Sequence, residues 1–78
     1  MNTYIALLKG INVGGHKKVP MADLRELLSK SGFENVQTYI QSGNVILQSN
    51  NSDISKIESD IEKSIEDYFG FEVSVLVK

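Results

Sequence analysis

The apolar residues of this chain fall into six runs. Two of the runs have the spacing of helices, and the other four are short runs typical of strands. The clearest helical run covers 54–68, where apolar residues recur at steps of three, four, four and three. Such spacing places them on one face of a helix, and Gly70 is suited to end that helix. The members of this stripe are Ile54, Ile57, Ile61, Ile65 and Tyr68.

The remaining runs predict one more helix and four strands. Pro20 is a helix-start signal, and Gly32 is a suitable C-cap for the helix that follows it. The polar residues 49–52 offer an N-cap for the second helix. The apolar positions of the first helix are Met21, Leu24, Leu27 and Leu28. We expect strands at 3–8, 36–41, 44–48 and 71–77, with a tight turn at Ser42-Gly43.

The resulting order, β-α-β-β-α-β, predicts an α+β fold of the ferredoxin-like type, with a four-stranded antiparallel sheet and two helices on one face. We expect the sheet order 4-1-3-2, in which the first strand is central. Its sequence is apolar on both faces, as is typical of a strand covered on both sides. Residues 1–78 contain no linker or internal repeat, so we expect a single domain.

Composition excludes several classes of site. The chain has no cysteine and one histidine, which excludes a disulfide framework, a cysteine nucleophile and a histidine-based metal cluster. We therefore expect no metal and no cofactor. No apolar run approaches the ~20 residues of a membrane span, and the start lacks a signal-peptide pattern. These features predict a cytoplasmic protein without a membrane partner.

The formal net charge of −2 conceals an asymmetry along the chain. Residues 1–18 carry three lysines and no acid, whereas residues 52–72 carry seven acids and two lysines. This distribution disfavours a wholly basic nucleic-acid binder and allows a local anion site. The acids of 52–72 alternate with the isoleucines, so we interpret them as a solvated helix face.

The run from Lys9 to Lys18 combines three of the six glycines with three of the eight basic residues. It departs from the Walker A pattern, because His16 stands where that pattern has lysine, and it also lacks the Rossmann pattern. Successive backbone N–H groups beside lysines can nevertheless hold a phosphate-bearing or other anionic ligand. The alternative is a connection whose glycines serve positive φ angles.

In the predicted topology this loop and the turn between the second and third strands lie at the same end of the sheet. Residues 10–18 and 41–44 should therefore be neighbours in space. Together they supply the candidate ligand-binding residues, which are Gly10, Asn12, Gly14, Gly15, His16, Lys17, Lys18, Gln41, Ser42 and Asn44.

With both helices on one side, the other face of the sheet is predicted to be open and apolar. Tyr39, Ile46 and Leu76 belong to it, joined by one of two alternating sets from the first strand. These sets are Ile5 and Leu7, or Tyr4, Ala6 and Leu8. Monomers seldom leave such a patch bare, which indicates a surface for a partner.

Three motifs stand in the chain in a fixed order: G-I-N-V-G-G at Gly10–Gly15, K-V-P-M-x-x-L-R at Lys18–Arg25 and T-Y-I-Q-S-G-N-V at Thr38–Val45. With these three motifs, the sequence resembles the bacterial family called domain of unknown function 1697, and the resemblance covers nearly the whole chain. The resemblance implies a protein about twice as long, with a second α/β half after the equivalent of Val77. It carries over no catalytic residue.

Four functions remain open from the sequence. The first is an anion-binding domain that uses the loop end, and the second is an interaction module whose sheet face docks the second half or a homodimer partner. The third is an enzyme with His16 as acid or base and its other groups elsewhere, although no acidic residue is expected beside His16 to orient it. RNA binding through the sheet is disfavoured, because that mode needs stacked aromatic residues and basic flanks.

Overall fold

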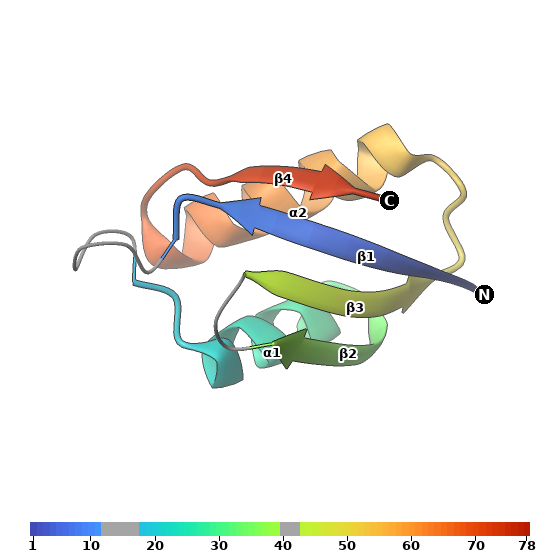
Figure 1. The fold of residues 1–78 in the computed structure, drawn as a ribbon, viewed down its shortest axis with the longest axis horizontal. Helices are drawn as coiled ribbons and strands as arrows, with labels where there is room; N and C mark the ends of the chain where they lie inside the picture. The colour runs from blue at the N-terminus through green and yellow to red at the C-terminus, as the bar shows by residue number, and fades with distance from the viewer. Residues whose placement is uncertain (12–17, 40–42) are drawn as a thin grey trace.

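The computed structural model describes residues 1–11, 18–39 and 43–78 of the chain, and its elements follow the predicted order β-α-β-β-α-β (Figure 1). Each predicted element is present, with some boundaries shifted. The strands are β1 (Asn2–Lys9), β2 (Glu34–Tyr39), β3 (Asn44–Ser49) and β4 (Ser74–Val77), and the helices are α1 (Met21–Lys30) and α2 (Ile54–Phe69).

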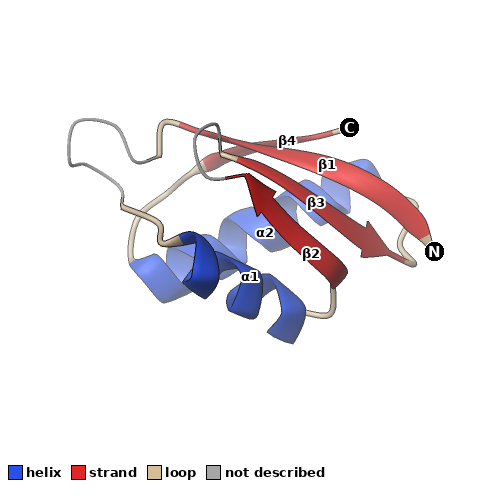
Figure 2. Cartoon of the chain, turned by 60° about the horizontal axis from the view of Figure 1, so that its bottom comes forward, coloured by secondary structure: helices blue, strands red, loops and turns tan. Residues whose placement is uncertain are grey.

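The four strands form one antiparallel sheet in the order β2-β3-β1-β4. Both helices pack against the same face of this sheet, and the other face is left uncovered by them (Figure 2). This arrangement confirms the predicted ferredoxin-like topology and the central place of β1. The helices cover only one face of β1, and its other face, which is also apolar, belongs to the open side of the sheet that the topology predicted.

The core lies between the sheet and the helices. Side chains of β1 alternate between the two faces of the sheet, so every second residue of this strand points into the core. Tyr4, Ala6 and Leu8 are buried, whereas Ile5 is exposed and Leu7 is half-buried. The Tyr4 hydroxyl remains satisfied at the edge of the core, because it donates to the Asn51 carbonyl oxygen at 2.7 Å. One of the two sets left open by the sequence therefore faces the helices, and the other faces outward.

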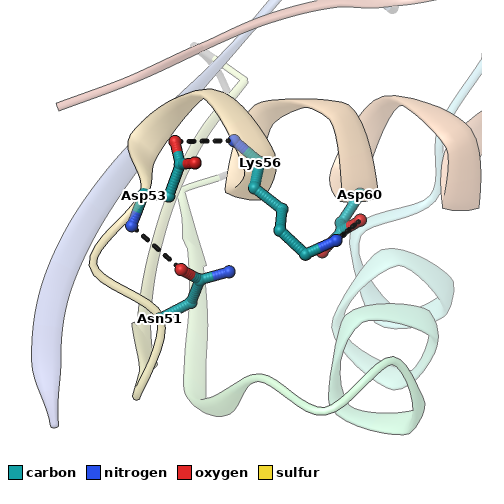
Figure 3. A network of polar contacts seen from close by, with 4 residues as sticks. All are labelled: Asn51, Asp53, Lys56 and Asp60. Atoms are coloured by element: carbon teal, nitrogen blue, oxygen red, sulfur yellow. Dashed lines mark hydrogen bonds and ion pairs between the residues drawn. The ribbon is translucent and has the colours of Figure 1, made fainter.

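Helix α2 begins one residue later than the polar turn suggested. Asp53 is its N-cap and accepts a hydrogen bond from the Lys56 backbone N–H at 3.3 Å (Figure 3). The Asn51 side chain in turn accepts from the Asp53 backbone N–H at 2.9 Å. The expectation of a cap within 49–52 was wrong because Asp53, with extended backbone, is the residue directly before the first turn. Gly70 ends the helix in the left-handed conformation, as predicted.

The apolar stripe of α2 is buried only in its middle. Ile57, Ile61 and Ile65 are nearly inaccessible, whereas Ile54 is 42% and Tyr68 60% exposed. The periodicity was read correctly, and the two exposed members of the stripe lie in the first and last turns of the sixteen-residue helix.

Helix α1 starts directly after Pro20 and ends with Ser31 as its C-cap, where Gly32 was expected. Gly32 follows with a positive φ of 104°, so it turns the chain one residue later. Strand β4 starts at Ser74 and not at 71, and β2 starts earlier than predicted, with a bulge between Glu34 and Gln37. None of the helices among the described residues could cross a membrane.

Candidate functional site

The described ends of the predicted loop and turn meet at one end of the sheet. The Leu8 backbone N–H donates to the Gly43 carbonyl oxygen at 2.9 Å. A Cβ atom placed on Gly43 would lie 3.5 Å from the side chain of Ile11, which is buried. The neighbourhood of the two segments is thus confirmed for these residues.

Three of the ten candidate ligand-binding residues fall within the described part of the chain. Gly10 is exposed with a φ of 74°, Lys18 is exposed, and Asn44 is half-buried at the first position of β3. The other seven lie outside the described residues: Asn12, Gly14, Gly15, His16, Lys17, Gln41 and Ser42. Lys9 adds a further exposed cation next to Gly10.

On the uncovered face of the sheet, four aliphatic side chains lie on three neighbouring strands, β3, β1 and β4. Ile5 lies directly opposite Ile46, and Leu7 lies directly opposite Leu76. Directly opposed residues of an antiparallel pair project to the same side of the sheet, so these four form one cluster, which we call the open-face cluster. Ile5 is 44% and Leu76 38% exposed.

Of the two sets that the sequence left open for the first strand, Ile5 and Leu7 are therefore the residues that share the open face with Ile46 and Leu76. Tyr39, the fifth predicted member, pairs with Asn44 in the strand register, and its side chain lies outside what the structure describes.

Polar groups surround the open-face cluster. Lys78 exchanges two backbone hydrogen bonds with Ile5, at 3.0 and 2.8 Å, and Lys9 lies opposite Ser74 at the other end of β4. On the other side the Gln48 amide donates to the Thr3 hydroxyl at 3.2 Å and accepts from the side chain of Asn35. An apolar centre within a polar rim is the usual composition of a protein interface.

Two acidic residues of α2 have a role that sequence reasoning missed. Glu58 and Glu62 are half-buried, and their carboxylates accept hydrogen bonds from the Val77 and Val75 backbone N–H groups at 2.8 and 2.9 Å. The prediction of a wholly solvated acidic face was wrong for this pair. Their spacing of four residues, which places both side chains on the same side of the helix, was the available signal.

Two pockets lie beside α2, and neither is lined by Gly10, Lys18 or Asn44, the described members of the predicted anion site. The larger, about 260 Å³, lies between α2 and β4 and is lined by Glu62, Glu66, Glu72, Val73 and Ser74. The smaller, about 90 Å³, lies between α1 and Tyr68 and includes Glu26 and Lys30. These two residues form an exposed ion pair, in which the hydrogen bond from Lys30 lowers the pKa of Glu26 and raises that of Lys30. Within the described ranges, no group of three or more acidic or histidine side chains is placed to hold a metal ion.

The fold and its uncovered face define a small α+β domain of ferredoxin-like topology. The chain belongs to the family DUF1697, proteins of unknown function, whose model matches residues 1–78. Among solved structures, it is similar to that of the conserved bacterial protein SP0830 from Streptococcus pneumoniae, with a TM-score of 0.79 and 38% sequence identity. The match covers 96% of this chain and 42% of the streptococcal chain, so this chain spans less than half of that relative's length. No curated protein is significantly similar to it.

Proposed function

We propose that this domain is an interaction module whose open sheet face packs against a further part of a longer polypeptide. The observation that carries the proposal is the open-face cluster, in which Ile5 on the central strand β1 is 44% exposed and Leu76 on the adjoining edge strand β4 is 38% exposed. Fully burying one aliphatic side chain contributes about 1.5–3 kcal/mol. Covering a cluster of half-exposed aliphatic residues therefore favours association.

The length of the streptococcal relative supports the choice of occupant. The streptococcal relative has the same fold over 96% of this chain, while the matched region makes up only 42% of its own length. A further unit of polypeptide tied to this domain has a high effective concentration at the sheet face. It would therefore outcompete a second copy of the domain, which has to be recruited from solution.

Residues 1–78 expressed alone should associate reversibly through the uncovered face, and Ile46→Lys or Ile5→Lys should make them monomeric. A lysine in the cluster places a charge where an apolar contact forms. Ile54→Lys is a matched control, since Ile54 is 42% exposed but lies on α2, away from this face. Sedimentation equilibrium measures the association.

The occupant is identified by adding the unmatched part of the streptococcal protein in trans and following the amide NMR shifts of Ile5, Leu7 and Leu76. Shifts at these amides together with dissociation of the oligomer support the proposal. An oligomer that persists unchanged would identify a second copy as the occupant and contradict our choice. A wild-type chain that stays monomeric at millimolar concentration, or equal effects of Ile54→Lys and Ile46→Lys, would reject the interface altogether.

A second function, anion binding at the loop end, is supported by exposed cations on both sides of the loop: Lys9 directly precedes the positive-φ residue Gly10, and Lys18 follows the loop. Cations next to backbone N–H groups attract phosphate through charge and hydrogen bonding. A Cβ atom placed on Gly43 would lie 3.5 Å from the Ile11 side chain, and this nearness of the two segments supports the proposal.

Replacing Lys17 and Lys18 together with alanine should weaken binding of a nucleotide or of inorganic phosphate several-fold. Thermal unfolding should change little, because surface substitutions stay within about ±0.5 kcal/mol. Titration followed by the NMR shifts of the Gly10, Ile11 and Lys18 amides measures binding. Lys56→Ala/Lys63→Ala removes the same charge from α2 and is the control. Equal weakening by both double variants, or amides that do not shift with any probe, would contradict a site at the loop.

A further inference from the structure

The outer edge of β4 has an unusual set of hydrogen-bond partners. In an antiparallel ladder, alternate residues of an edge strand bond to the neighbouring strand, and the residues between them point outward. Lys78 exchanges both of its backbone hydrogen bonds with Ile5 of β1. The backbone N–H and carbonyl groups of the odd-numbered residues of β4 therefore point away from β1, toward the outer edge of the sheet. The N–H groups of Val75 and Val77 therefore point away from the sheet.

Both outward N–H groups end at carboxylates of α2. The Val75 N–H donates to Glu62 Oε2 at 2.9 Å, and the Val77 N–H donates to Glu58 Oε2 at 2.8 Å. Glu58 and Glu62 are one helical turn apart, so they lie on the same side of α2. The helix packs along β4, which brings both carboxylates to its outer edge (Figure 1). Two successive outward donors are thus satisfied from one helix.

The two edges of the sheet are protected by different means. At the opposite edge, β2 is interrupted by the bulge between Glu34 and Gln37, where Asn35 has a φ of 51°. Bulges of this kind hinder pairing with another strand. Strand β4 is regular along its four residues, so its protection falls to the two glutamates.

We infer that the β4 edge is a latent surface for strand addition by a second copy of this chain, and that Glu58 and Glu62 keep it closed. Antiparallel pairing of β4 with β4 of a second copy, centred on Leu76, places Val75 opposite Val77 of that copy. Each outward N–H then meets an outward carbonyl group, and the two sheets join into one. The same N–H groups cannot serve a carboxylate and a strand together, so the glutamates and the second copy compete.

This inference is independent of the proposed docking function, because it concerns the edge of the sheet and not its face. The experiment is therefore carried out in the Ile46→Lys variant, in which the open-face cluster no longer supports association. Amide hydrogen exchange at Val75 and Val77 reports on the edge itself, and sedimentation reports on the oligomeric state.

At low protein concentration, Glu62→Ala should speed exchange at Val75 about tenfold, and Glu58→Ala should do the same at Val77. This magnitude is that of losing one hydrogen bond to a charged acceptor. At high concentration, Glu58→Ala/Glu62→Ala should form a dimer in which both amides exchange more slowly than in the parent. The single variants keep the inference testable even where the double variant folds poorly.

Two matched variants separate capping from simple loss of charge. Asp60→Ala/Asp67→Ala removes two acids from exposed positions of α2 and should leave the parent monomeric. Glu58→Gln/Glu62→Gln retains carbonyl acceptors and should suppress the dimer relative to the double alanine variant. Dimerisation of the Asp60/Asp67 variant to the same extent would overturn the inference. So would a double alanine variant that is folded and monomeric at millimolar concentration.

Discussion

Gly43→Ala should destabilise the domain by about 3 kcal/mol, although it adds a single methyl group. Gly43 has a φ of 65°, and a Cβ atom there would lie 2.5 Å from the carbonyl oxygen of Leu8. The left-handed conformation costs a non-glycine residue roughly 1–2 kcal/mol. The clash adds to this cost because the Leu8 N–H is bonded to the Gly43 carbonyl oxygen, so one strand cannot move away without losing that bond. Urea unfolding monitored by circular dichroism measures the loss.

Gly70→Ala provides the control for this prediction. Gly70 has a similar φ of 82°, but a Cβ atom there would have no atom within 4 Å. It should therefore show only the conformational cost, about 1 kcal/mol. Equal losses at the two positions would mean that the close approach of Leu8 and Gly43 contributes nothing. A larger loss at Gly43 would support a tight junction between the start of β3 and the end of β1.

Ile61→Ala should cost about 2–5 kcal/mol, the range for truncating a fully buried aliphatic side chain. Ile61 is completely buried in the middle of α2, between the two other buried isoleucines of the stripe. In a domain of this size, each kcal/mol lowers the melting temperature by about 4–8 °C. The variant should therefore melt at least about 8 °C below the wild type in a calorimetric scan.

Ile54→Ala is the internal control for Ile61→Ala. The same substitution is made in the same helix, but Ile54 is 42% exposed, so the change should stay within about 0.5 kcal/mol. A large loss at Ile54 would show that the N-terminal turn of α2 is covered in solution by something other than the described core. A small loss at Ile61 would contradict the packing of the helix on the sheet.

Local pattern was sufficient for the elements and their order. The stripe of isoleucines predicted α2, Pro20 predicted the start of α1, and Gly70 predicted the end of α2. These signals depend on residues within one turn of each other, so they can be read without knowing the rest of the fold. The order of the elements then predicted the topology, because few arrangements of β-α-β-β-α-β satisfy the rules of strand connection.

The face of each strand was less accessible to the sequence. Strand β1 has apolar residues at both odd and even positions. Its pattern therefore allowed either Ile5 and Leu7, or Tyr4, Ala6 and Leu8, to face outward. The pairing with β3 and β4 settled this, since Ile5 stands opposite Ile46 and Leu7 opposite Leu76. The membership of the open-face cluster therefore depends on strand register, which joins residues more than thirty positions apart.

The sequence by itself determined the ferredoxin-like topology, the two helices and the family, together with the nearness of Ile11 and Gly43, the described ends of the loop and hairpin turn. Only the tertiary structure decided that Glu58 and Glu62 bond the edge of β4 while the acids around them stay in water. The physical reason is that the partners of a carboxylate are set by what packs against its helix. The N–H groups of β4 come within reach of Glu58 and Glu62 only when β4 pairs with β1 in the folded sheet.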